Sequence, residues 1–238
     1  MSDRHRLHDA FVLHSRPFRN SSQIVELLTP EHGKVGVVAR GSSRGKNPQS
    51  ALLQPFRPIQ VAWSGRGDLH SVTALEPAGA AYSLSGRRMF CGLYANELMV
   101  RLLHRDDPHP AVFKQYHLLI EQLSVGADEG RLLRSFEVQL LEAVGFGFDL
   151  HCDSGGLPID AEQRYRYHPE EGMVAVGGES GQRTTVMGRT LEWLRATETQ
   201  VEQAILREAK QLLRSAIDYH IPGELQSRKL IAQYSTIQ

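Results

Sequence analysis

The stretch 33-GKVGVVARG-41 decides the fold of the first third of this 238-residue chain. Val35, Val37 and Ala39 alternate with positions that include Lys34 and Arg40, which is the period of a strand with one buried face. Four further stretches are rich in β-branched and aromatic residues and are bounded by Pro, Gly, Asn or Ser: 10–18, 22–30, 56–65 and 68–77. Five short strands with no helix between them predict a small barrel of the OB type. The longest connection, "ARGSSRGKNPQS", is expected to line a ligand groove.

From about residue 82 the apolar period changes to that of helices. Amphipathic helices are predicted within 92–104, 107–123 and 130–146, the second with Pro110 near its start. These helices need one another to bury their apolar faces, so a helical bundle should follow the barrel. The fold class is therefore α+β.

The remaining chain predicts a small hairpin at 164–176 and a final helix at 198–221, ended by Pro222 and Gly223. Four regions result: an OB-fold nucleic-acid-binding domain over 1–80, a helical domain over 81–150, a hairpin-containing region over 151–190, and a C-terminal helix within 191–238 that packs on the helical domain.

The composition excludes several classes of protein. Apolar residues make up 41% of the chain, which is typical of a soluble globular protein, and no run of about 18 apolar residues predicts a membrane span. Two isolated cysteines, Cys91 and Cys152, indicate a reducing compartment, so we expect a cytoplasmic protein. The net charge is zero, yet residues 1–80 carry ten Lys and Arg against six Asp and Glu. An anionic partner would therefore meet the N-terminal third, unless this excess is ordinary surface scatter.

Enzyme signatures are missing from the sequence. The stretch "GSSRGKNP" lacks the spacing of a phosphate-binding loop, and neither G-x-S-x-G nor H-E-x-x-H occurs. The fragment "GFGF" at 145–148 follows a predicted helix and is read as its C-terminal cap. Asp106 and Asp107 are better explained as a turn before a helix than as a two-metal nuclease pair. No catalytic residue is assigned.

A metal site is weighed at His151, Cys152 and His168, with Asp153 nearby. Structural zinc usually has paired ligands such as C-x-x-C, and no second cysteine lies there. We therefore expect no metal and no other cofactor, although residual metal binding at these residues stays open. The eleven histidines are expected at the surface.

The N-terminal third has the residue types that bind single-stranded nucleic acid, namely cations for phosphates and aromatic rings for bases. The candidate cations are Arg16, Arg19, Arg40, Arg44, Lys46, Arg57 and Arg66. Phe18 and Trp63 are the candidate stacking rings. Core packing of the rings and a merely solvated loop are the competing explanations.

Several segments together resemble the RecO family of bacterial recombination mediators, in order from about residue 8 to 235. They are "FVLHSRPFRNSS", "GKVGVVARGSSRGKN", "LQPFRPI", "GRGDLHSVTALE", "GLYANELMVRLL", "LRSFEVQLLEAVGFGFDLHCDSG" and "LQSRKL". The resemblance implies an OB-fold domain, a helical middle, a small C-terminal region and a non-enzymatic role. Many members carry a four-cysteine zinc module where this chain keeps only Cys152, so the resemblance implies a metal-free variant of that module.

The resemblance also implies partners and site residues. The family binds single- and double-stranded DNA, anneals complementary strands and binds the acidic C-terminal tail of single-stranded DNA-binding protein (SSB). With RecR it helps RecA load on SSB-coated DNA, which places the protein at the nucleoid. Arg16, Lys34, Arg40, Arg44 and Lys46 stand in the matching N-terminal motifs and are the implied DNA contacts. The implied tail-binding residues are Arg131, Leu132, Leu133, Arg134 and Phe136, with pairing of Arg134 to Glu137 or Asp128 as the alternative. An OB-fold protein–protein adaptor with incidental DNA binding is the alternative function.

Overall fold

The computed structural model describes residues 6–42, 48–65, 67–177, 185–196 and 202–237. The chain forms two compact units, one of residues 1–127 with 225–238 and one of residues 128–224. Among the described residues, the first unit contains the barrel and four helices, one of them short, and the second contains the small sheet and three helices.

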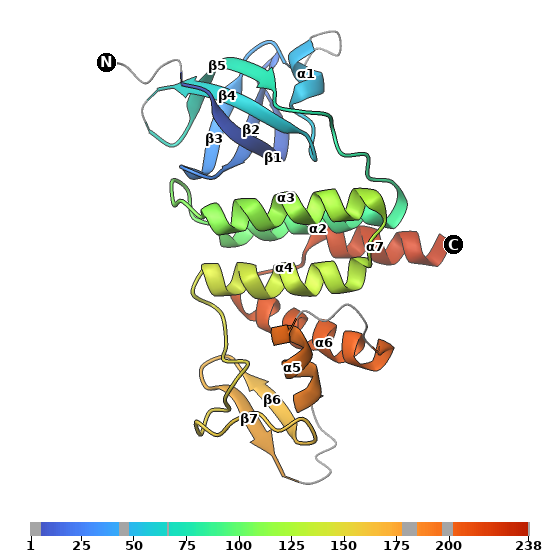
Figure 1. The fold of residues 1–238 in the computed structure, drawn as a ribbon. Coiled ribbons are helices and arrows are strands. Elements are labelled where there is room, and N and C mark those ends of the chain that lie inside the picture. The colour runs from blue at the N-terminus through green and yellow to red at the C-terminus, as the bar shows by residue number, and fades with distance from the viewer. Residues whose placement is uncertain (1–5, 43–47, 66, 178–184, 197–201, 238) are drawn as a thin grey trace. The chain divides into compact units, whose positions relative to one another are not determined.

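The first 80 residues form a closed barrel in the order β1-β2-β3-β5-β4 (Figure 1). Its strands are β1 (His8–Phe18), β2 (Ser22–Thr29), β3 (Gly33–Ala39), β4 (Pro58–Ser64) and β5 (His70–Pro77). All neighbours pair antiparallel except β3 and β5, which pair parallel. The predicted OB-type barrel is thus confirmed. A short helix, α1 (Pro48–Leu52), lies between β3 and β4 and was not predicted, because a five-residue helix is too short to show a period.

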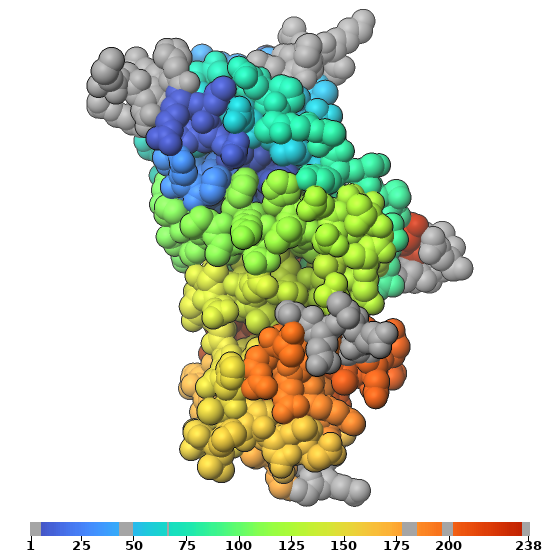
Figure 2. Space-filling model, viewed as in Figure 1, coloured from blue at the N-terminus to red at the C-terminus, as the bar shows by residue number. Residues whose placement is uncertain are grey.

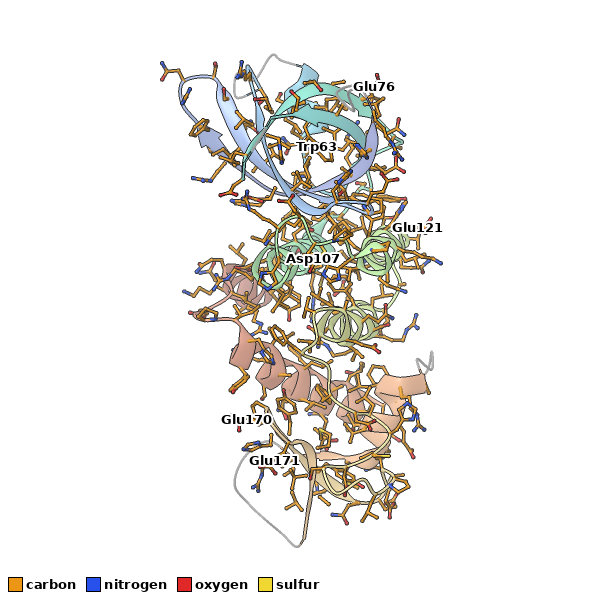
Figure 3. All side chains as sticks on the ribbon, turned by 90° about the vertical axis from the view of Figure 1, so that its left-hand side faces the viewer. Trp63, Glu76, Asp107, Glu121, Glu170 and Glu171 are labelled. Atoms are coloured by element: carbon orange, nitrogen blue, oxygen red, sulfur yellow. The ribbon has the colours of Figure 1, made fainter. Side chains whose placement is uncertain are left out.

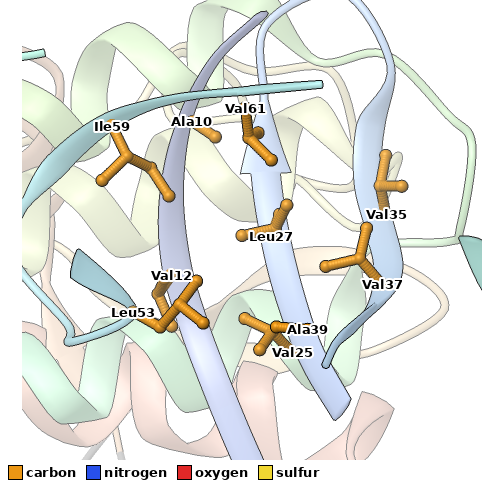
Figure 4. Close-up of a cluster of buried hydrophobic side chains, with 10 residues drawn as sticks. All are labelled: Ala10, Val12, Val25, Leu27, Val35, Val37, Ala39, Leu53, Ile59 and Val61. Atoms are coloured by element: carbon orange, nitrogen blue, oxygen red, sulfur yellow. The ribbon is translucent and has the colours of Figure 1, made fainter. Parts of the chain in front are cut away.

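The barrel is filled by small, mostly β-branched side chains of β1, β2, β3 and β4 (Figure 4), and the half-buried Val72 and Leu75 of β5 pack against them. Val35, Val37 and Ala39 are each at most 2% exposed, as their alternation in the sequence predicts. Leu53, which follows α1, adds a side chain from outside the strands to the same cluster. Small side chains fill this core because the interior of a five-stranded barrel is narrow.

Three helices complete the first unit: α2 (Gly86–Leu102), α3 (Pro110–Val125) and α7 (Gln226–Ile237). Helix α2 contacts β1, α3 and α7, and Figure 2 shows the barrel residues, blue to cyan, packed directly against green residues of these helices. Glu97 of α2 accepts hydrogen bonds from the backbone N–H groups of Gln226 and Ser227 and thereby caps α7. The pKa of the Glu97 carboxyl is lowered; burial opposes this change, and the hydrogen bonds from Ser227 and Gln226 outweigh it.

The buried side chain of Asn96 connects α2 to an irregularity in β1. The pairing register of β1 with β2 shifts between Val12 and His14, which leaves Leu13 out of the ladder. The Asn96 Nδ2 donates to the carbonyl oxygens of Leu13 at 3.0 Å and Val12 at 3.4 Å. Asn96 is 2% exposed, so water does not reach this position, and the side-chain amide donates to the two carbonyls instead.

The second unit contains α4 (Glu129–Ala143), β6 (Arg164–His168), β7 (Gly172–Val176), β8 (Thr185–Met187), α5 (Gly188–Ala196) and α6 (Gln203–His220). The sheet order is β7-β6-β8, so the predicted hairpin is present and a third strand joins it. Helix α6 contacts α4, α5 and β8. The boundaries of the two compact units differ from those of the four predicted regions. The segment 191–238 contains α6, α7 and most of α5, and α7 belongs to the first unit.

The fragment 145–148 caps α4, as its position after a helix predicts. Gly145 has φ 78°, and the N–H groups of Gly145 and Phe146 donate to the carbonyls of Glu142 and Leu141. A Cβ at Gly147 would lie 3.0 Å from the Glu142 Cα, so the returning chain needs glycine there.

We predict that Asn96→Ala lowers the free energy of unfolding by about 1–3 kcal/mol, because it removes the buried side-chain donor to the carbonyls of Val12 and Leu13. Urea denaturation measures the change. Gln54→Ala is the control, since that amide is exposed and bonds only within its own turn, to Ser50. Equal stability of Asn96→Ala and the wild type would show that the bulge does not need this amide.

Candidate nucleic-acid interface

Three predicted DNA contacts, Arg16, Arg19 and Arg40, lie at one end of the barrel. Arg16 pairs with Ile24, which in turn pairs with Val38, so the end of β1, the start of β2 and the end of β3 lie side by side. Arg19 directly follows β1 and Arg40 directly follows β3. Two strand spacings put the backbones of β1 and β3 about 10 Å apart here. All three side chains are exposed, and we call them the arginine rim.

The arginine rim has no nearby acid in its own strands. Residues 14–24 and 38–42 contain no Asp or Glu, so the field at this end of the barrel is not cancelled locally. The Arg19 guanidinium lies over the Phe18 ring, 5.0 Å from its centroid. Phe18 is half-buried, so a base stacked on its free face would have to share the ring with Arg19.

The structure does not support Lys34 as a DNA contact. Lys34 is 9% exposed and its Nζ donates to the carbonyl oxygen of Val100 at 2.6 Å. Val100 lies in the last turn of α2, where carbonyls lack helical partners, so Lys34 caps this helix. Burial lowers the pKa of Lys34, Glu26 opposes this change, and Arg105 adds to it. The sequence motif alone could not distinguish this buried lysine from a surface one.

Other candidates are separated from the arginine rim. Arg57 precedes β4, whose Pro58 pairs with Phe11, so it is level with Val12, about 13 Å along β1 from Arg16. Trp63 packs against the barrel core, and Figure 3 shows it within the outline of the barrel. It lies near the end of β4, which runs antiparallel to β1 and pairs there with the start of β5. Core packing, the competing explanation for Trp63, therefore has the stronger support. Arg44, Lys46 and Arg66 lie outside the described residues.

Arg105 was not predicted, although it connects strand β2 to the loop before β5. Its guanidinium pairs with the Glu26 carboxylate and donates to the Asp68 carbonyl oxygen at 2.5 Å. A Cβ at Gly36 would occupy the position of this guanidinium, so glycine at position 36 makes the contact possible. Nothing in the local sequence connects Arg105 to residue 36, because the contact depends on tertiary structure.

The predicted tail-binding residues on α4 fall into two groups. Leu133, Arg134 and Phe136 are buried, whereas Arg131 and Leu132 are half-buried. The Nε and Nη2 of Arg134 donate to the two carboxylate oxygens of Glu137 at 2.6 and 2.5 Å. Arg134 is 6% and Glu137 1% exposed, so the alternative partner Glu137 is present, but the pair is buried and not on the surface.

A cavity of about 510 Å³ lies within the second unit, between α4, the segment 145–151 and the end of α5. Its lining residues are Ser135, Val138, Gln139, Leu141, Glu142, Gly145, Gly147, Phe148, Asp149, Leu150, His151, Leu194 and Arg195. None of the five predicted tail-binding residues lines it. Arg131 nevertheless shares one helix face with Ser135 and Val138, because these positions follow the i, i+4, i+7 spacing.

The other weighed sites have ordinary structural roles. Asp106 and Asp107 lie in the turn between α2 and α3, where Asp107 pairs with His109, the residue that directly precedes α3. In the second unit, the His151 ring lies 3.3 Å from the Arg195 Nη1. Among the described residues, His151, Cys152 and His168 belong to no group of three potential ligands whose atoms lie close together.

Comparisons with known proteins agree with this architecture. A family model described as "Recombination protein O N terminal" matches residues 1–81, and one described as "Recombination protein O C terminal" matches residues 84–229. The "DNA repair protein RecO" of Halorhodospira halophila is 43% identical over 225 residues, covering 93% of this chain and 94% of that protein. Proteins of the same name from Methylococcus capsulatus and Coxiella burnetii are 41% and 39% identical, over 96% and 92% of this chain and 94% of each relative.

The fold and the rim define an OB-barrel protein with a basic end. The chain belongs to the RecO family of DNA repair proteins, as the segments in the sequence predict. Among the described residues, no helix has the length and apolar character needed to cross a membrane.

We predict that Arg134→Ala lowers the free energy of unfolding by about 3–5 kcal/mol, because it removes the guanidinium that neutralises the buried Glu137 carboxylate. The double variant Arg134→Leu with Glu137→Leu should be clearly more stable than Arg134→Ala, since it removes both charges. Thermal and urea denaturation of the three proteins make the comparison. A single variant as stable as the wild type would mean that the pair is exposed to water in solution.

Proposed function

We propose that the protein is a DNA repair and recombination mediator without catalytic activity of its own. It binds single- and double-stranded DNA through the arginine rim and the adjoining loop, and it anneals complementary strands. It also binds the C-terminal tail of SSB and, together with RecR, promotes loading of RecA on SSB-coated DNA. Membership of the RecO family supports the general role.

One observation carries the DNA-binding part of the proposal. The register of β1, β2 and β3 brings Arg16, Arg19 and Arg40 to one barrel end in stretches that contain no acid. Guanidinium groups bind phosphate oxygens strongly and irrespective of sequence, which suits a protein that must act on any strand. Neutralising the phosphates of two strands at one surface lowers their repulsion and thereby allows annealing.

The tail of SSB, an acidic peptide with an apolar end, needs a cation and an apolar slot. The cavity beside α4 offers Val138, Phe148 and Leu194 as apolar lining and Arg195 at its edge, with Arg131 on the same face of α4. Arg134 already has a carboxylate partner in Glu137, so we assign the cationic role to Arg131 and Arg195 and treat Arg134 as a residue that stabilises the helix. This assignment rests on charge, shape and helix spacing.

The second candidate function is a protein–protein adaptor in which DNA binding is incidental. The same cavity favours it, because a peptide pocket does not require DNA. The two functions differ in what the arginine rim does, so variants of the rim distinguish them.

We predict that the triple variant Arg16→Glu, Arg19→Glu, Arg40→Glu loses strand annealing and binds oligonucleotide at least 10-fold more weakly at low salt. The slope of log affinity against log salt on single strands should fall by about 2, since each lost phosphate contact removes about 0.7. Fluorescence anisotropy over a salt series measures both quantities.

The matched control is Arg189→Glu, Arg207→Glu, Lys210→Glu, which makes the same change in net charge on exposed residues of the second unit. Equal losses in the two triple variants would contradict a rim-specific contact and reduce the effect to net charge. Unchanged annealing in the rim variant would favour the adaptor.

We predict that Arg131→Ala with Arg195→Ala weakens binding of a labelled SSB tail peptide about 10-fold or more, while DNA annealing stays at the wild-type level. Arg189→Ala is the control, because this exposed cation of α5 does not line the cavity. The contrary result is a peptide affinity that falls only in variants that have a lowered free energy of unfolding, such as Arg134→Ala. That result would mean that the tail does not bind in this cavity.

A further inference from the structure

The barrel end opposite the arginine rim carries a group of potential metal ligands. His8 at the start of β1 and Glu31 and His32 in the β2–β3 turn have ligand atoms that all lie within 4.8 Å of one another. Among the described residues, no other group of three His, Cys, Asp or Glu side chains meets that spacing. His8 is only 8% exposed, contrary to the expectation that the histidines lie at the surface.

The fold holds these three side chains in place before any ion binds. The Thr29 hydroxyl, fully buried, accepts from the His32 N–H and donates to the Gly33 carbonyl oxygen, both at 3.1 Å. Gly33 has φ +65°, and a Cβ there would overlap the backbone of Asp107, which is labelled in Figure 3. The turn that presents Glu31 and His32 is therefore fixed by its own hydrogen bonds and by a close backbone approach.

Aromatic packing fixes the two imidazole rings. Trp63 lies against both of them, with ring centroids 4.9 Å from His8 and 5.3 Å from His32. The two imidazoles meet edge to face with centroids 4.5 Å apart. Rotation of either ring away from the other would break these contacts, so the cluster has the preorganisation that a metal site needs.

The ligand chemistry favours one class of ion. Two imidazoles and one carboxylate suit zinc and its neighbours in the first transition series, and not magnesium or calcium, which prefer all-oxygen sites. Ligand atoms at about 2.0 Å from a tetrahedral ion lie about 3.4 Å apart. The His8 Nδ1 and Glu31 Oε2 are already 3.0 Å apart, so rotation of the exposed Glu31 side chain can complete the set.

Charge around the site is compatible with a divalent cation. Glu31 also pairs with the exposed Arg6, whose Nη2 lies 3.2 Å from the Oε1, and this arginine can turn to water when an ion binds. Glu31 is half exposed and gives the ion a path from solvent, while His8 and Trp63 close the inner side.

We propose that His8, Glu31 and His32 form a zinc-binding site that ties the start of β1 to the β2–β3 turn, with the remaining coordination position open to water. The site lies apart from the proposed DNA and peptide surfaces and does not depend on them. Three protein ligands and one open position are the arrangement of a catalytic zinc centre. A bound ion would also link the start of β1 to the β2–β3 turn and thereby stabilise the barrel.

The test uses the full-length protein, freed of metal with a chelator, and titration calorimetry with Zn²⁺. We expect one site whose affinity falls at least 10-fold in Glu31→Gln and in His32→Ala. His14→Ala, an exposed histidine of the same strand β1, is the matched control and should bind as the wild type does. The variant His151→Ala with Cys152→Ser removes two of the other potential ligands considered above and should likewise keep the affinity.

A second readout follows from Trp63. Cu²⁺ bound by the two imidazoles should quench the emission of Trp63 at one equivalent, and this quenching should be lost in Glu31→Gln and His32→Ala but retained in His14→Ala. Because Glu31 is exposed, its variant should keep the wild-type melting temperature without metal, which separates lost binding from lost folding. Zn²⁺ affinity that is unchanged in Glu31→Gln and His32→Ala, or that disappears with His151 and Cys152, would overturn the proposal.

Discussion

The hydrogen bonds from Asn96 to the bulged part of β1 are the interaction on which the first unit depends. A five-stranded barrel needs sharp changes of strand direction, and the bulge at Leu13 supplies one at the cost of carbonyls outside the ladder. Burying that strand against a helix is favourable only if the helix brings a donor, and Asn96 is that donor. The same helix receives Lys34 at its last turn and caps α7 through Glu97, so barrel, α2 and α7 form one connected unit.

The barrel has two chemically different ends because its strands alternate in direction. The end of β1, the start of β2 and the end of β3 present arginines to solvent, while the start of β1 and the β2–β3 turn present histidines around a tryptophan. Guanidinium groups stay charged at every physiological pH and suit phosphate binding, whereas neutral imidazoles are ligands for metal ions.

Much of the fold follows from local sequence, and much of the site does not. The alternation around Val35 and the 3.6-residue period after residue 82 predict the barrel and the helices, because each pattern reports which face a single element buries. Lys34 looks like any strand cation, yet the carbonyl it caps belongs to Val100, 66 residues away. Arg134 pairs with a residue three positions along its own helix, which the sequence allows, but its burial is a tertiary property. The strand β8 was missed because it has only three residues, and the helix α7 was missed because contacts distant in sequence, with α2, hold it in place.

Carboxylates hold the segment between α4 and β6. The Asp149 Oδ1 accepts the N–H of His151, the Asp153 Oδ1 accepts those of Gly155 and Leu157, and the Asp160 Oδ1 accepts that of Glu162. Backbone bonds then join the loop to β7, from Ser154 to Met173, and close it on itself, from Asp153 to Leu157. Hydrogen bonding to the charged form lowers the pKa of Asp149, so its turn persists across the physiological pH range. Three acidic side chains thus fix local turns of this segment, and each turn can form by itself without the others.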